Sequence, residues 1–408
     1  MNTVAVVGAS LAGLSAARAL REQGFSGELV VVGEERHRPY DRPPLSKELL
    51  AGRVTVADLG LETDDEQLDA RWLLGTRATG LDAATRRLTL SDGTHLDADG
   101  IVIATGARAR TLPGTETLAG VHTLRTLDDA LALRDELLPG RRLVVIGAGF
   151  IGAETASTAH ALGLDVTVVE AMATPLSGPL GVEMGAVVCG LHTDHGVRLR
   201  CGTGVHRLVG SDRVEGVELA DGTLLAADLV LVGIGAIPNI GWLQGSGLAL
   251  GNGVLCDAGG LTSRPGIAAV GDCAAWLDER SGQHQRVEHW TGALERPRVA
   301  VAGLLSGGGP HAPVGPPYFW SDQYDKKIQS LGLPGRAEGI ELLESTPDGA
   351  RLVYGAARDG RLVGIIAINA ARRLGAYRMT LEDPPGLDEL RARLADDPGA
   401  LGAPVAAV

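Results

Sequence analysis

One pattern occurs twice in this chain and constrains its fold strongly: an apolar strand, a glycine turn, a helix, a second strand and an acid. In the first copy, the apolar run 4–7 leads into residues 8–13 (GASLAG), and a second run at 29–32 is followed by Glu35. This order is typical of a βαβ motif that binds a dinucleotide with its pyrophosphate at the helix N-terminus. Ser10 stands where a second glycine is usual, so an ordinary glycine-rich turn is an alternative interpretation.

The second copy has all three glycines. The run 142–146 leads into residues 147–152 (GAGFIG), and the next apolar run, 166–169, ends at Glu170. A carboxylate at this place accepts hydrogen bonds from an adenosine ribose and repels a 2′-phosphate. Residues 171–184 contain no lysine, arginine or histidine that could bind such a phosphate. We therefore expect NAD here, with NADH preferred over NADPH.

Further segments indicate more strands: a strand pair at 94–96 and 100–103, and a segment at 224–232 that matches this pair. Another run ends at Asp272, and an aspartate at the carboxyl end of a strand can bind a ribityl hydroxyl or a water on a pyrophosphate. From residue 319 short strands alternate with Gly and Asp turns, and one amphipathic helix follows near 387–394. The predicted fold class is α/β, with two Rossmann-like dinucleotide-binding domains and a small α+β C-terminal domain.

The composition argues against several classes of protein. Lys plus Arg total 37 against 50 Asp plus Glu, a net charge of −13, which does not favour a nucleic-acid surface. The four cysteines are too scattered for a disulfide framework or a zinc site, and we expect them to be buried thiols. The N-terminus has no basic region of a signal peptide, and no apolar stretch approaches a membrane span. We expect a cytoplasmic protein that binds no metal and no membrane.

Three further segments carry a resemblance to a known family. They are residues 39–47 (PYDRPPLSK), 288–291 (EHWT) and 319–324 (FWSDQY). With the two glycine turns, they make the chain resemble the FAD-dependent NADH:ferredoxin reductases of bacterial oxygenase systems, the group of putidaredoxin reductase and biphenyl-dioxygenase ferredoxin reductase. The likeness extends from Val4 to about Leu381.

The resemblance implies a glutathione-reductase-like architecture with FAD on the first motif and NAD on the second. The implied division is an FAD-binding domain in two parts, 1–109 and 237–316, an NAD-binding domain at 110–236, and a C-terminal α+β domain with a frayed tail at 317–408. The protein would be a monomer or a homodimer.

The resemblance also implies three catalytic residues. Lys47 would lie beside the flavin N5 edge and pair with Glu154, where a cation favours the electron-rich reduced flavin. Trp290 would cover the pyrimidine end of the flavin, and a lone core tryptophan is its alternative interpretation. The alternative for Lys47 is a pair with Glu48 or a position facing solvent. The alternative for Glu154 is that stabilising the N-terminus of its helix is its sole role.

The remaining expected contacts follow the family's motifs residue by residue. Glu35 would bind the adenosine ribose and Arg42 the pyrophosphate or adenine side of FAD. The other FAD contacts would be Gly8, Ser10, Ala12, Gly13, Lys47, Ala78, Ala104, Thr105, Gly106, Arg125, Asp272 and Trp290. The NAD contacts would be Gly147, Gly149, Ile151, Gly152, Glu154, Glu170 and Gly235.

Two places depart from the family. Thr174 and Gly178 stand where relatives carry basic residues, which leaves the strength of NADH binding open. Pro297 follows the 288–291 segment, where we expect it to shape the start of the next helix, with an unknown effect on the flavin edge.

The implied function is the transfer of a hydride from NADH to FAD and of single electrons to a [2Fe–2S] ferredoxin, which supplies a haem monooxygenase or a Rieske-type oxygenase. Residues 36–60 contain no cysteine, which excludes the flavin–thiol relay of disulfide reductases. The alternatives are a rubredoxin or quinone reductase and a redox-sensing flavoprotein similar to apoptosis-inducing factor. An acidic ferredoxin needs a positive surface on this acidic chain, and the candidates are Arg36, Arg38, Arg296, Arg298, Lys326 and Lys327. A solvated charged face is the alternative for these cations.

Overall fold

The computed structural model describes residues 1–63, 65–115, 117–279 and 281–396, and the chain divides into two compact units. Unit 1 comprises Met1–Asp41, Val56–Arg108 and Ala236–Gly315. Unit 2 comprises Arg42–Thr55, Ala109–Gly235 and the chain from Pro316 onward. Unit 2 contains both the second dinucleotide motif and the C-terminal sheet. The division into two units does not test the four functional segments expected from the sequence, which stay a prediction.

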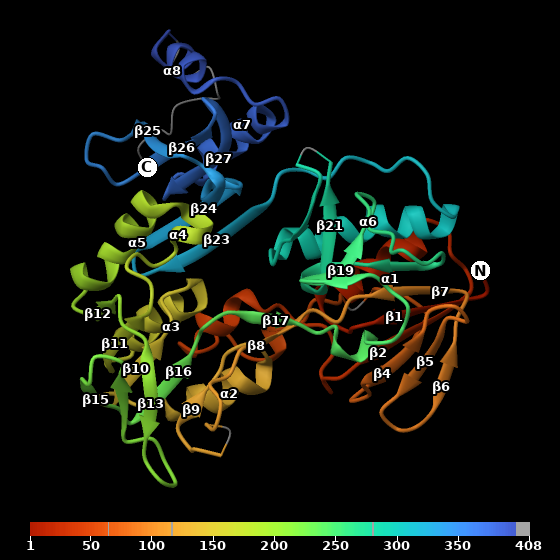
Figure 1. The fold of residues 1–408 in the computed structure, drawn as a ribbon, viewed down its shortest axis with the longest axis horizontal. Coiled ribbons are helices and arrows are strands. Elements are labelled where there is room, and N and C mark those ends of the chain that lie inside the picture. Colours follow the sequence, from red (N-terminus) through yellow and green to blue (C-terminus); the bar gives the residue numbers. More distant parts are fainter. Residues whose placement is uncertain (64, 116, 280, 397–408) are drawn as a thin grey trace. The chain divides into compact units, whose positions relative to one another are not determined.

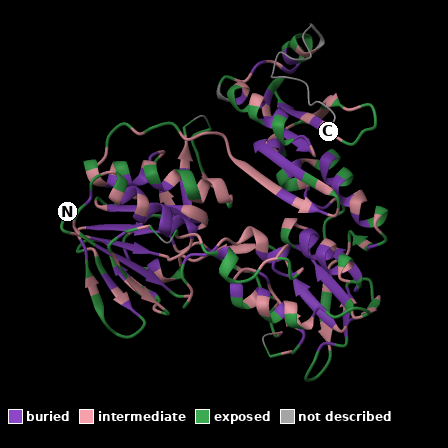
Figure 2. Ribbon diagram, turned by 180° about the vertical axis from the view of Figure 1, so that it is seen from behind, coloured by how far each residue is buried: buried purple, intermediate pink, exposed green. Residues whose placement is uncertain are grey.

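Unit 1 is built on a five-stranded parallel sheet with the strand order β20-β7-β1-β2-β3. Strands β1, β2 and β7 of this sheet are labelled in Figure 1. Its apolar runs are buried on both faces, as parallel strands covered by helices must be (Figure 2). Helices α1 and α6 pack on each other in this unit. The bounds are β1 (Thr3–Val7), α1 (Leu11–Glu22), β2 (Glu28–Gly33), β3 (Ala70–Leu74), β7 (Gly100–Ile103), β20 (Ile267–Ala269) and α6 (Trp290–Ser306).

Two smaller sheets complete unit 1. One is antiparallel and contains β4 (Ala78–Asp82), β5 (Arg87–Leu90) and β6 (His95–Asp97). The other is mixed and contains β18 (Leu250–Gly251), β19 (Gly253–Cys256), β21 (Ala274–Asp278) and β22 (Gln283–Arg286). Two of the points at which the chain passes from one unit to the other lie at β8 (Ala107–Ala109) and β17 (Ala236–Pro238), and the others follow Asp41, Thr55 and Gly315.

The first part of unit 2 is a second parallel sheet with the order β12-β11-β10-β16-β9. The segment expected at 224–232 contains two strands, β15 and β16, which are separated by a bend at Ala227-Asp228. The bounds are β9 (Val121–His122), α2 (Leu127–Glu136), β10 (Arg142–Ile146), α3 (Phe150–Ala161), β11 (Asp165–Glu170), α4 (Ser177–Leu180), α5 (Val182–Asp194), β12 (Arg198–Cys201), β13 (Val205–Val209), β14 (Gly216–Leu219), β15 (Leu224–Ala226) and β16 (Leu229–Val232).

The second part of unit 2 is a five-stranded antiparallel sheet with the order β23-β24-β27-β26-β25. Its core includes the fully buried Tyr377 and Leu390. The amphipathic helix expected near 387–394 is α8, and the frayed tail, residues 397–408, lies outside the described residues. The bounds are β23 (Tyr318–Gln323), β24 (Lys326–Gly332), β25 (Gly339–Ser345), β26 (Leu352–Arg358), β27 (Arg361–Ile368), α7 (Ala371–Glu382) and α8 (Leu387–Asp396).

The predicted fold class, two dinucleotide-binding parallel sheets and a small C-terminal α+β domain, is confirmed. Of the helices in the described residues, none has the length and apolar character needed to cross a membrane.

Candidate active site

The first glycine turn, in unit 1, leaves no room for side chains at two of its positions. A Cβ on Gly8 would lie 2.0 Å from the Ala104 carbonyl oxygen, and one on Gly13 would lie 1.8 Å from the Gly8 oxygen. Gly8 also has a φ of +126°, which L side chains rarely adopt. Ser10 is the N-cap of α1. The turn therefore has the geometry that the sequence predicts, with the α1 N-terminus and the end of β7 held together.

Several other predicted FAD contacts gather around this turn. A Cβ on Gly271 would lie 2.8 Å from the Ala12 Cβ, so the loop that carries Asp272 packs on the first turn of α1. Glu35, which follows β2, accepts a hydrogen bond of 2.6 Å from Tyr40. Thr105 donates to the Asn239 carbonyl at 2.8 Å, and Gly106 follows it with a φ of +62°. Ala78 is in the antiparallel sheet, where it is buried in the same hydrophobic core as Ala12 and Ala104.

Trp290 is the first residue of α6, and its Nε1 donates a hydrogen bond of 2.7 Å to the Asp41 carboxylate. This contact links two of the three segments that carry the family resemblance. Pro297 does not begin a new helix, contrary to expectation, because α6 runs unbroken from Trp290 to Ser306 and encloses it. Proline has no N–H, so this helix lacks one interior hydrogen bond at that position.

The second glycine turn, in unit 2, repeats the close packing of the first. A Cβ on Gly147 would lie 2.3 Å from the Gly233 oxygen, and one on Gly152 would lie 2.1 Å from the Gly147 oxygen. Gly149 differs, because beyond its two chain neighbours no described residue comes within 4 Å of the Cβ it would carry. It is the N-cap of α3, where helix N–H groups are unpaired. The open space in front of these groups fits a pyrophosphate that must approach the backbone closely.

Glu170 is fixed beside this turn by two backbone groups. One carboxylate oxygen accepts from the Ala148 N–H at 2.9 Å, and the other accepts from the Met172 N–H at 2.9 Å. Gly235, with a φ of +97°, follows the end of β16, while Ile151 is 46% exposed in the first turn of α3. The residues around the second turn fit an adenine dinucleotide.

Arg42 and Arg125, two further predicted FAD contacts, lie side by side in unit 2. The Arg42 guanidinium donates to the Arg125 carbonyl oxygen at 2.6 Å. The Arg125 N–H in turn donates to Asp129, whose carboxylate also takes part in the capping box at the start of α2. This places Arg42 on a fixed helix terminus.

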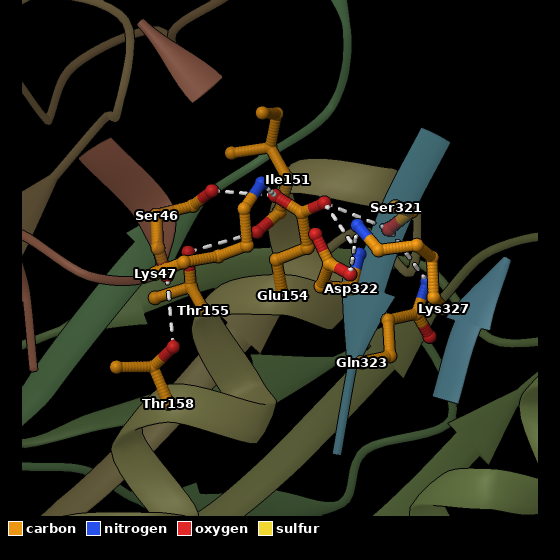
Figure 3. A network of polar contacts seen from close by, with 10 residues as sticks. All are labelled: Ser46, Lys47, Ile151, Glu154, Thr155, Thr158, Ser321, Asp322, Gln323 and Lys327. Atoms are coloured by element: carbon orange, nitrogen blue, oxygen red, sulfur yellow. Dashed lines mark hydrogen bonds and ion pairs between the residues drawn. The ribbon is translucent and has the colours of Figure 1, made fainter. Parts of the chain in front are cut away.

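A buried ion pair lies beneath the second glycine turn. The Lys47 Nζ is 3.1 Å from Glu154 Oε2, and the two side chains are only 9% and 5% exposed (Figure 3). The Ser46 hydroxyl donates to the same oxygen at 2.5 Å. Removing two charges from water is costly unless geometry and further hydrogen bonds compensate. Here the compensation is provided by hydroxyl and amide donors.

The position of Lys47 is set by a short helical turn at Pro43–Ser46. Thr158 of α3 donates to the Ser46 carbonyl at 2.9 Å, which holds that turn against the helix. The pairing that the resemblance implied for Lys47 is therefore present, and Lys47 neither pairs with Glu48 nor faces solvent. The alternative that Glu154 does no more than stabilise the N-terminus of α3 is wrong, because its carboxylate contacts Ser46, Lys47 and Ser321.

Two hydroxyls of this site were missed from the sequence. Ser46 and Ser321 both contact Glu154, and Ser321 donates to Oε1 at 2.8 Å. Each lies inside a segment that carries the family resemblance, and that is the only signal the sequence offers. A serine beside a lysine or an aspartate otherwise indicates nothing about its partners.

The cations proposed as a docking surface have partners of their own in the structure. Four of the six candidate docking cations have acidic or aromatic neighbours within their own unit. Arg38 pairs with Glu62, and its Cζ lies 3.9 Å from the centre of the Trp72 ring, while the Cζ of Arg296 lies 5.0 Å from the centre of the Trp276 ring. Lys326 pairs with Asp325, and Lys327 pairs with Asp322. These pairs favour the alternative of a solvated charged face.

Cys201 is exposed rather than buried, because it ends the edge strand β12, whereas Cys189, Cys256 and Cys273 are buried thiols as expected.

Comparison with known proteins adds to this geometry. The family model described as pyridine nucleotide-disulphide oxidoreductase matches residues 2–296, and the one described as reductase C-terminal matches residues 318–402. The chain is 39% identical to the ferredoxin reductase component of chlorobenzene dioxygenase from Cupriavidus sp. (strain PS12), over 96% of this chain and 95% of the relative. It is 37% identical to rhodocoxin reductase from Rhodococcus erythropolis, over 95% of this chain and 92% of the relative.

Two solved structures are similar over nearly the whole chain. One is putidaredoxin reductase in its covalent complex with putidaredoxin, with a TM-score of 0.90 and 34% identity over 95% of each chain. The other is the ferredoxin reductase for the CYP199A2 system from Rhodopseudomonas palustris, with a TM-score of 0.91 and 34% identity over 99% of this chain and 100% of that chain.

Proposed function

Because the chain belongs to the pyridine nucleotide-disulphide oxidoreductase family, among the ferredoxin reductases of bacterial oxygenase systems, we propose that it oxidises NADH and reduces a [2Fe–2S] ferredoxin one electron at a time. The family implies FAD and a nicotinamide dinucleotide as cofactors. Bound FAD supplies the chemistry that no side chain offers, since it takes up a hydride and gives up electrons singly.

One observation carries this proposal: a buried lysine is paired with a carboxylate on the helix that begins at the second glycine turn. Lys47 keeps a positive charge in a water-poor site, where it favours a neighbouring group that gains electrons. Glu154 compensates that charge and, on α3, comes two residues after Gly152 of the turn. In this proposal the two are catalytic residues beside the flavin, together with Trp290, which Asp41 orients.

The remaining predicted contacts have the proposed role of holding the two dinucleotides. Around the first turn, the backbone of residues 8–13 would bind the FAD pyrophosphate, Glu35 its adenosine ribose, and Asp272 the ribityl chain or pyrophosphate. Around the second turn, Gly149 would allow the NAD pyrophosphate to approach the backbone. Each assignment rests on the family motif and on the local geometry of its own unit.

A preference for NADH over NADPH is part of the proposal. The two backbone hydrogen bonds hold the Glu170 carboxylate beside the second turn. There it would accept hydrogen bonds from the hydroxyls of an adenosine ribose and would repel a 2′-phosphate. The names of relatives as ferredoxin–NAD(+) reductases support the same preference. We also place the protein in the cytoplasm, where its four free thiols suit a reducing compartment.

The identity of the acceptor can be tested by steady-state kinetics of the FAD-loaded protein with NADH. A [2Fe–2S] ferredoxin, a rubredoxin and a water-soluble quinone are compared as acceptors under one set of conditions. We expect ferredoxin to give the highest kcat/KM. Equal or higher values with rubredoxin or the quinone would contradict the proposed acceptor while leaving NADH oxidation intact.

A further inference from the structure

The C-terminal sheet contributes directly to the environment of Glu154. Strand β23 places the Ser321 hydroxyl 2.8 Å from Glu154 Oε1 and the Asp322 backbone N–H 3.3 Å from the same oxygen (Figure 3). Lys47 and Ser46 donate hydrogen bonds to the other oxygen, Oε2. The two oxygens of one buried carboxylate are therefore held from two sides, by two segments far apart in the sequence.

The Ser321 hydroxyl has a defined direction. Ser321 and Gln323 are both 0% exposed and lie on the same face of β23, because alternate residues of a strand share a face. The Gln323 amide donates to the Ser321 oxygen at 3.1 Å. With that lone pair occupied, the hydroxyl hydrogen is available for Glu154. The three groups form an ordered chain of hydrogen bonds that ends on the carboxylate.

The turn after β23 is anchored on the same helix. The Tyr324 N–H donates to the Ser157 hydroxyl at 2.7 Å, and Ser157 is three residues after Glu154 on one face of α3. Tyr324 has a φ of +54°, a backbone conformation that is costly for a bulky residue and persists only when its surroundings hold it. Its hydroxyl lies 2.7 Å from His192 Nδ1 of α5. The hairpin thus has several contacts that fix β23 relative to α3.

From these contacts we infer that Ser321 is a positioning residue for the Lys47–Glu154 pair, so that the C-terminal sheet completes the reductive site. The inference rests on the proposed function of that pair. Ser321 and the Asp322 N–H share the negative charge of Glu154, which leaves more of the Lys47 charge to act on the flavin. They also prevent the carboxylate from rotating away from Lys47.

The test uses the full-length, FAD-loaded protein and the variants Ser321→Ala and Ser321→Thr. We expect Ser321→Ala to lower the limiting rate constant of flavin reduction by NADH about tenfold, because the buried oxygen Oε1 of Glu154 loses the shorter of its two hydrogen bonds. The Kd for NADH should stay unchanged. The midpoint potential of the flavin, titrated with dithionite, should fall by about 30 mV, the equivalent of tenfold for two electrons. Ser321→Thr keeps the hydroxyl and should restore both values.

Ser330→Ala is the matched control, since Ser330 is buried in β24 of the same sheet and its hydroxyl has no hydrogen bond among the described residues. It should leave rate and potential unchanged. In a Glu154→Gln background, Ser321→Ala should cost no more than about twofold, because the two residues act as one unit. If the alanine variant does not fold, Ser321→Cys, which weakens the donor at similar volume, replaces it in every comparison.

The inference is overturned if Ser321→Ala leaves both rate and potential within the range of the control, if only the Kd for NADH changes, or if the full loss persists in the Glu154→Gln background. Failure of the proposed function looks different. In that case NADH does not reduce the wild-type flavin, while the dithionite titration still compares the potentials of the variants.

Discussion

The buried Lys47–Glu154 pair gives the most direct prediction at the scale of single residues. Lys47→Met leaves a buried carboxylate without its cation, and we expect a loss of about 3 kcal/mol of stability. Replacing both residues, as Lys47→Met with Glu154→Leu, leaves no unpaired charge and should cost clearly less than the sum of the two single changes. Thermal unfolding of the FAD-loaded variants measures this cycle. Additive losses would mean that the two charges do not interact.

Glu170 gives a second prediction at this scale. Glu170→Ser removes the charge that would repel a 2′-phosphate, while the backbone N–H groups of Ala148 and Met172 become available to a phosphate. The ratio of kcat/KM for NADH to that for NADPH should fall by about tenfold or more. Glu183→Ser, which also removes a carboxylate from the chain after β11, serves as the control and should leave the ratio unchanged. An unchanged ratio in Glu170→Ser would contradict the assigned ribose contact.

The sequence predicted some of these residues better than others, for physical reasons. Glu170 follows from a local pattern, because a βαβ motif places its acid at the end of the second strand. Lys47 and Glu154 are 107 residues apart, and only the family resemblance suggested their contact. Ser321 is 167 residues from Glu154 and was missed as a partner, since a buried serine leaves no periodic or charge signal. Cys201 was wrongly expected to be buried, because its exposure depends on which strand forms the sheet edge.

At the scale of elements, two glycines of the second turn have different roles: Gly152 allows close backbone packing, and Gly149 allows a ligand to approach. Gly152→Ala would place a Cβ 2.1 Å from the Gly147 oxygen, so we expect a marked loss of thermal stability. Gly149→Ala enters space that is open in the described structure and should stay within about 1 kcal/mol of wild type. It should nevertheless weaken NADH binding by about tenfold, because the backbone can no longer approach the pyrophosphate. Thermal midpoints and NADH titrations distinguish the two, and equal effects of both changes on stability would contradict the assignment.

The contact between α5 and the β23–β24 turn predicts a dependence of stability on pH. Burial lowers the pKa of His192 from 6.5 to about 4, so this histidine stays neutral in the folded protein and binds a proton near pH 6.5 only when unfolded. Its stabilising contribution is complete above pH 6.5 and is lost as the pH falls toward 4. Between pH 7.5 and 5.5 the loss amounts to about 1 kcal/mol.

Urea unfolding of His192→Asn at these two pH values tests this prediction. The variant should show a smaller loss on acidification than the wild type. His206→Asn, at an exposed position in β13, is the control and should behave as the wild type does. An undiminished loss in His192→Asn would show that other groups cause the acid sensitivity.

The elements themselves show where sequence patterns suffice. Strands β1, β2, β10 and β11 were predicted because each is a continuous apolar run next to a glycine turn. The edge strands β9 and β12 were not predicted, since one has two residues and the other, RLRC, is polar. Pro297 was expected at a helix start, but α6 continues through it from Trp290 to Ser306, and it packs on α1 of the same unit. Local pattern fixes the sheet centres, and long-range pairing decides the edges.

At the scale of the whole molecule, one chain contains two dinucleotide-binding motifs and a C-terminal sheet whose strand β23 contacts the buried pair. Each unit contains a glycine turn with the same close backbone packing, and the pair lies within unit 2. Residues 36–60 offer no cysteine, so electrons accepted from NADH have no thiol in that segment to pass through. Membership among the ferredoxin reductases assigns these electrons to an external ferredoxin.

The most direct test of this claim is anaerobic stopped-flow mixing of the purified FAD-loaded protein, first with NADH and then with an oxidised [2Fe–2S] ferredoxin, followed at the flavin absorption band. We predict rapid bleaching by NADH and recovery of the oxidised flavin band on addition of ferredoxin. Bleaching that persists in the presence of ferredoxin would contradict electron transfer and favour a redox-sensing flavoprotein. A flavin band that NADH does not change would contradict the account at its first step.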